Sequence, residues 1–65
     1  MKANYDANTD TLTLELKPGI VAVSDEDKPG VILDYDAQGD LIGIEVLDAS
    51  KRVAEERTMQ FQVTE

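Results

Sequence analysis

An alternation of apolar and polar residues with a period of two is the strongest constraint on the fold of this chain. In the run TLTLEL, residues 11–16, leucines occupy every second position, with two threonines and a glutamate between them. Because successive side chains of a strand point to opposite faces, this run predicts a strand with one buried and one solvated face. The segment Lys2–Asp6 can pair with it across the turn formers ANTD, so residues 2–16 are expected to form a β-hairpin.

Further strands are expected downstream, separated by Pro-Gly pairs. Pro18-Gly19 interrupts the pattern because proline has no backbone donor for a sheet, and Ile20–Ser24 is predicted as a linking strand. The charged run Asp25–Lys28 is interpreted as a solvated strand end and loop. After a second Pro-Gly pair, Val31–Tyr35 and Leu41–Leu47 predict a second hairpin around the turn DAQGD. The nearly continuous apolar run of its return strand favours a central position in the sheet.

The C-terminal part loses this regular alternation. Asp48 or Ser50 can cap a helix, and the helix formers of Ala49–Arg57 predict a short helix with little apolar surface. The final MQFQV alternates again, with Met59 and Phe61 on one side. It is interpreted as a last strand, an arm exchanged with a second subunit, or a frayed end.

The chain also contains an internal repeat. Tyr5–Leu16 aligns with Tyr35–Val46 without gaps, and Tyr, Asp, Ala, Asp and Glu coincide. The aliphatic residues of the two return strands fall in the same register, which predicts that Ile42 and Ile44 share one face. The repeat is interpreted as two turns with the same local Asp chemistry, and a pair of equivalent binding sites is the alternative.

These patterns predict an α+β, mainly β fold: an antiparallel meander of two repeated β-hairpins plus a linking strand, with a short helix near the C-terminus. Gly43 within a strand indicates a bulge or a close approach by a neighbouring group. Residues 1–65 are expected to form a single domain, with 1–52 as its core and 53–65 as the end of the helix and a tail or strand. The predicted core side chains are Leu12, Leu14, Leu16, Val21, Val23, Ile32, Tyr35, Ile42, Ile44, Val46 and Val53.

Charge and missing residue types restrict the possible partners. The chain has 14 acidic and 6 basic residues, a net charge of −8, and neither cysteine nor histidine. Such a surface repels phosphate backbones and anionic membranes, and favours a basic protein or a divalent cation. Disulfides and ordinary zinc sites are excluded, and no cofactor is expected. A chain of this size buries a smaller fraction of its surface on folding than a larger domain does, and often needs a further source of stability. Because disulfides and zinc are excluded, a homodimer is the working hypothesis.

No stretch is long and apolar enough for a membrane span, and the N-terminus does not resemble a signal peptide. A cytoplasmic location is therefore expected. Without histidine, a nucleophile–base pair or a phosphate-binding loop, the chain is not expected to be an enzyme.

Two groups of residues are candidate sites. The segment 34–45, DYDAQGDLIGIE, fits the spacing of a twelve-residue calcium loop, but its flanks predict strands where such a loop needs helices. Its turn carboxylates and amide remain weak candidates for a cation. Aromatic and apolar side chains are candidates for a protein interface instead. The cation candidates are Asp34, Asp36, Gln38 and Asp40, and the interface candidates are Tyr5, Tyr35, Met59 and Phe61.

The run VILDYDAQGDLIGIEVLDASK, residues 31–51, resembles the core of a bacterial family known as domain of unknown function 2283, as do YDANTDTLTLEL and the acidic SDED. The resemblance covers about residues 1–52. It implies a small cytoplasmic β-meander domain with a helix near its end and no established activity. Some members lie beside small toxin-like ribonuclease proteins, which implies an antitoxin or partner-binding role.

Three functions follow as hypotheses. The first is a protein-interaction module, antitoxin-like toward a basic toxin-type partner. The second is a cation-binding domain that uses the segment Asp34–Glu45. The third is a purely structural homo-oligomer.

Overall fold

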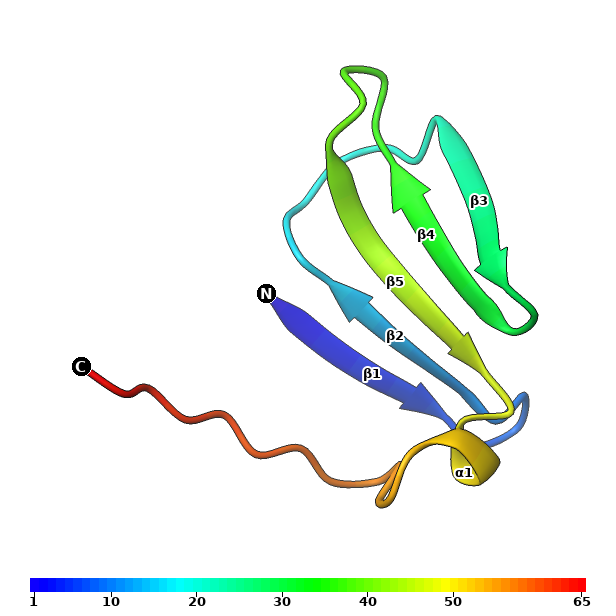
Figure 1. Cartoon of the computed structure of the whole chain (residues 1–65), viewed down its shortest axis with the longest axis vertical. Coiled ribbons are helices and arrows are strands. Elements are labelled where there is room, and N and C mark those ends of the chain that lie inside the picture. Colours follow the sequence, from blue (N-terminus) through cyan, green and yellow to red (C-terminus); the bar gives the residue numbers. More distant parts are fainter.

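The computed structural model describes residues 1–65 and contains one open sheet of five antiparallel strands and a single helical turn (Figure 1). The elements are β1 (Lys2–Asp6), β2 (Thr11–Glu15), β3 (Val23–Lys28), β4 (Val31–Tyr35), β5 (Leu41–Leu47) and α1 (Ala49–Arg52). The strands lie in the order β1-β2-β5-β4-β3. The mainly β class and both predicted hairpins are therefore confirmed. The meander order is wrong, because β2 pairs with β5 and not with β3.

The β2–β5 ladder joins the two hairpins. Leu14 pairs with Ile44, and Leu12 pairs with Val46, in antiparallel register. The chain leaves β2 through a loop, residues 16–22, that crosses the sheet beside the start of β5 and enters β3 at the far edge (Figure 1). This long crossing leaves the space beside β2 free for β5, which makes β5 the central strand as predicted.

One face of the sheet is apolar. The ladders place its side chains in two rows that cross β1, β2, β5 and β4, and all of these residues except Ala3 are half-buried. This apolar face consists of Ala3, Leu14, Ile44 and Leu33 in one row and Tyr5, Leu12, Val46 and Val31 in the other. The molecule measures 34 × 32 × 19 Å, the shape of a single-layer slab.

The opposite face is mostly polar, and the same ladders define it. This polar face consists of Asn4, Thr13, Glu45, Ile32 and Glu26 in one row and Lys2, Glu15, Gly43, Asp34 and Ser24 in the next. The loop of residues 16–22 lies against part of it: Gly19 and Val21 line one depression together with Asp34 and Gly43.

A bulge in β5 decides which apolar side chain is buried. Asp34 pairs with Gly43 and Tyr35 pairs with Leu41, so Ile42 has no partner on β4. Its side chain lies against the loop, where a Cβ built on Gly19 would be 3.3 Å from Ile42 Cδ1. Ile42 is only 4% exposed. The bulge predicted near Gly43 is present, but the prediction that Ile42 shares a face with Ile44 is wrong, because the extra residue reverses the alternation.

Two segments differ from their predicted positions. The linking strand starts at Val23, not at Ile20, and it includes the charged run of residues 25–28, which is an exposed edge strand. Val21 and Val23 are 49% and 58% exposed, so neither belongs to the core. Polar side chains suit an edge strand, because charges there discourage pairing with other chains.

The helix is also shorter than predicted. It ends at Arg52, and Val53 is already extended, because the following residues have too little apolar surface to hold a longer helix against the sheet. The tail after α1 forms no strand and leads away from the sheet on the β1 side (Figure 1). No helix in the structure has the length or apolar character needed to cross a membrane.

Replacement of Ile42 by valine tests the role of the bulge. Ile42→Val removes a buried methylene and is expected to lower the free energy of unfolding by about 1 kcal/mol. Ile20→Val makes the same chemical change at a side chain that is 87% exposed, and is expected to cost under about 0.5 kcal/mol. Urea denaturation of both variants measures the difference, and equal effects would contradict the burial of Ile42 by the loop.

Candidate interaction surface

Asp10 connects the first hairpin to the helix. Its backbone is left-handed, with φ of 54°. Its Oδ1 accepts the backbone N–H of Ser50 at 2.9 Å, its Oδ2 accepts the Ser50 hydroxyl at 2.6 Å, and its carbonyl oxygen accepts the N–H of Ala49 at 2.9 Å. These bonds satisfy N–H groups that a helix start leaves free. The predicted cap Asp48 is at the N-cap position but forms no side-chain capping bond.

Tyr5 belongs to the same network. Its hydroxyl donates to Asp10 Oδ1 at 2.7 Å. The bonds from Ser50 and Tyr5 hold the pKa of Asp10 below its ordinary value, and the bond to Asp10 raises the pKa of Tyr5. Tyr5 is therefore fixed at the end of the apolar face. Sequence reasoning missed the cap because Asp10 and Ser50 lie 40 residues apart, and no local pattern connects them.

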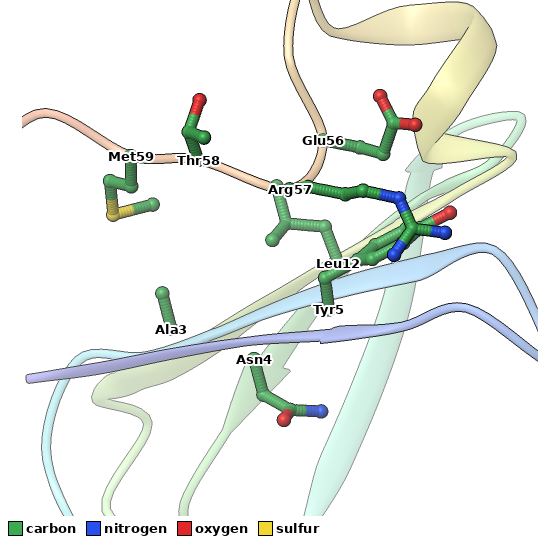
Figure 2. Close-up of a pocket in the computed structure, with 8 residues that line it drawn as sticks. All are labelled: Ala3, Asn4, Tyr5, Leu12, Glu56, Arg57, Thr58 and Met59. Atoms are coloured by element: carbon green, nitrogen blue, oxygen red, sulfur yellow. The ribbon is translucent and has the colours of Figure 1, made fainter.

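The tail covers this end of the apolar face. The Arg57 guanidinium carbon lies 5.5 Å from the centroid of the Tyr5 ring, within the range of a cation–π contact. Figure 2 shows Ala3 and Tyr5 on the side of the tail, whereas Asn4 points away. Between β1, Leu12 and tail residues 56–59 is a cavity of about 130 Å³. It is too small for most organic ligands, which occupy pockets of roughly 300–1,000 Å³.

The other interface candidates are more open. Tyr35 is half-buried and lines a shallow depression with Val23 at the β3 edge. Met59 and Phe61 are 58% and 74% exposed. The structure brings Tyr5 and Met59 together around one cavity, but Tyr35 and Phe61 are not part of it.

The four cation candidates do not converge. Asp36 Oδ1 accepts the backbone N–H groups of Gln38 and Asp40, and Asp40 Oδ2 pairs with Lys17 Nζ at 2.9 Å. Asp34 is only 5% exposed and accepts the hydroxyl of Ser24 on the polar face. The structure contains no group of three or more acidic side chains that could hold a metal ion. The Asp-rich turn is organised by its own backbone.

A pair of carboxyl groups lies on the polar face. A hydrogen bond shared with Asp34, together with partial burial and the nearby charge, raises the pKa of Glu45. The Ser24 hydroxyl donates to Asp34 Oδ1 at 2.6 Å, so the buried carboxyl group is not left without a partner. Sequence reasoning missed this pair because Asp34 and Glu45 meet only through the β4–β5 register.

Comparison with known proteins gives no assigned activity. A family model described as a protein of unknown function (DUF2283) matches residues 2–50. An uncharacterised protein of the archaeon Methanocaldococcus jannaschii is 39% identical over 51 residues, which are 78% of this chain and 43% of that protein. The chain thus spans less than half of the relative's length. The resemblance implied a bacterial family, whereas this relative is archaeal. No solved structure matches the chain.

Replacement of Asp10 by asparagine tests the link between hairpin and helix. Asp10→Asn tolerates the left-handed backbone but removes one carboxylate acceptor and the charge, so the melting temperature is expected to fall by several degrees at pH 7. A lowered pKa means that this stabilisation is present above the ordinary value of 3.8 and is lost as the pH falls through the lowered pKa. The difference from the unmodified chain is therefore expected to disappear in strong acid. Asp40→Asn, in an exposed ion pair, is the matched control and is expected to change little.

Replacement of Glu45 by glutamine tests the carboxyl pair. Because the pKa of Glu45 is raised, protonated Glu45 stabilises the folded state. This stabilisation is fully present below the ordinary pKa of 4.5 and is lost as the pH rises through the raised pKa. Glu45→Gln is therefore expected to stabilise the protein at pH 7, by under about 1 kcal/mol because water screens the pair. The gain is expected to vanish near pH 4. Thermal melts across this range measure it, with Glu15→Gln as the exposed control; a gain that does not depend on pH would rule out the shared proton.

Proposed function

Because this chain belongs to the DUF2283 family, which has no assigned activity, we propose its function from its own surfaces. It is a protein-interaction module that binds a basic partner, in the manner of an antitoxin that masks a basic toxin.

Unpaired negative charge is the observation that carries this proposal. Lys17 and Asp40 form the single ion pair of the structure, although the chain has 14 acidic residues. Neighbouring carboxylates repel one another at short range, and this repulsion destabilises the folded chain. A partner rich in Lys and Arg would remove this repulsion and would associate faster because opposite fields steer the encounter.

The acidic groups are placed where a partner can reach them. Asp25, Glu26 and Asp27 are exposed on the edge strand β3, and Glu15 and Glu45 lie in the polar face. Glu15, Glu45 and Glu26 place negative charge on the polar face from β2 to the β3 edge, where Asp25 lies on the opposite face beside Leu33. A basic protein surface is complementary to this negative charge, whereas the phosphate backbone of a nucleic acid would be repelled by it.

We also infer that the two hairpins are repeats of one design. Asp6 and Asp36, which align in the sequence, each accept the N–H of the residue two positions later. Leu14 and Ile44, which also align, pair directly with each other in the β2–β5 ladder. This arrangement relates the hairpins by a local two-fold axis, and it supports the structural interpretation of the repeat.

The product of the gene adjacent to this one is the probe for the proposed partner. Titration calorimetry with the purified chain is expected to show binding that weakens as salt is raised from 0.05 to about 0.5 M. Asp25→Lys combined with Asp27→Lys is expected to weaken binding about tenfold or more. Glu55→Lys combined with Glu56→Lys makes the same change of net charge in the tail and is expected to have a smaller effect. Absence of binding, or binding that ignores salt and both pairs, would overturn the proposal.

A further inference from the structure

We propose that the apolar face is a self-association surface, on which two copies of this chain pack face to face. This inference goes beyond the proposed function, because it uses the other side of the sheet. Its occupant is a second copy, and the contact is the part of the apolar face that the tail leaves uncovered, namely Leu14, Ile44, Leu33, Val46 and Val31.

The exposed area of the single chain points to a missing layer. A compact monomer of this mass is expected to expose roughly 4,100 Å², whereas the chain exposes 5009 Å². The excess is about 900 Å², close to the ~800 Å² that each partner buries in a standard interface. The apolar face and the extended tail share this excess, and the tail itself exposes the apolar side chains of Met59, Phe61 and Val63.

Burial within the chain leads to the same conclusion. Domains are ordinarily built from at least two packed layers around a core. Here the buried apolar residues are Ile42, under the loop, and Ala49, in α1. The aliphatic residues of the apolar face are at most partly buried, so burying them under another layer would add hydrophobic stabilisation.

The charge distribution favours a second copy over the basic partner at this face. At the β3 edge the register adds Asp25 beside Leu33 and Lys28 beside Val31, but over β1, β2, β5 and β4 neither row of the apolar face contains a charged residue. A basic partner would bury Lys or Arg there without a counter-charge, which is costly. Over these four strands two copies bring only apolar side chains together, while the carboxylates of Glu15 and Glu45 stay on the outer sides.

The geometry is that of a two-fold dimer. Two sheets pack with their inner faces about 10 Å apart and their strands within about 30° of each other. In such an arrangement the same patch serves both subunits, and Leu14 and Ile44 lie near its centre. The tail covers Ala3, Tyr5 and Leu12 at the β1 end, and Phe61 beyond it remains exposed and able to contact the second copy.

Sedimentation equilibrium of the full chain tests the dimer. The expected mass is twice the 7.1 kDa of one chain, and the melting temperature is expected to rise with protein concentration. Added salt is expected to strengthen this association, since it screens repulsion between acidic copies, whereas it weakens binding to a basic partner. The two proposals can therefore fail separately.

A matched pair of variants locates the surface. Leu14→Lys places a charge in the apolar face and is expected to yield monomers, with a dimer dissociation constant raised at least tenfold. Thr13→Lys makes the same charge change one residue earlier, on the polar face opposite Glu45, and is expected to leave the dimer intact. Circular dichroism checks that both variants fold.

If Leu14→Lys does not fold, sedimentation and melting of the wild-type chain still test the dimer. A folded wild-type chain of single-chain mass up to about 1 mM, with a melting temperature independent of concentration, would overturn the proposal. A folded Leu14→Lys variant that remains dimeric would overturn it as well.

Discussion

The ladder between β2 and β5 is the interaction on which the rest of this structure depends. It is the sole strand pairing between the N-terminal hairpin and the other three strands. Through the pairs Leu14–Ile44 and Leu12–Val46 it also assembles the centre of the apolar face. A slip of one residue in this register would turn the leucines of β2 to the polar side.

A sheet with two such different faces has consequences for function. The polar face is partly covered by its own loop, and the carboxyl group of Asp34 is buried there with Ser24 as donor. The apolar face has only the tail near Tyr5. One side of the sheet is thus prepared for apolar packing and the other for electrostatic contact. The Asp10 network holds α1 and the first hairpin together, so the start of the tail has a fixed position beside β1.

The features that neighbouring residues determine, namely the strands, the hairpins and their turns, could be predicted from the sequence. Alternation identified both hairpins, and Asp36 organises its turn through nearby N–H groups as its residue type suggests. Features that depend on distant segments were not predictable. The position of Ile42 follows from one unpaired residue in β5, and the cap on α1 comes from Asp10 in a remote turn. The length of the helix was overestimated because helix propensity counts for little without an apolar face to bury.

Intersubunit contacts provide the most direct measurement of how the apolar face is used. In a sample that mixes ¹³C-labelled and unlabelled chains, a filtered NOE experiment detects only contacts between different copies. Face-to-face packing gives intersubunit NOEs from the methyl groups of Leu14 and Ile44 and none from Thr13. Intersubunit NOEs confined to the β1 or β3 edge, or an absence of any in a folded sample, would contradict a sheet whose apolar face is completed by its own copy.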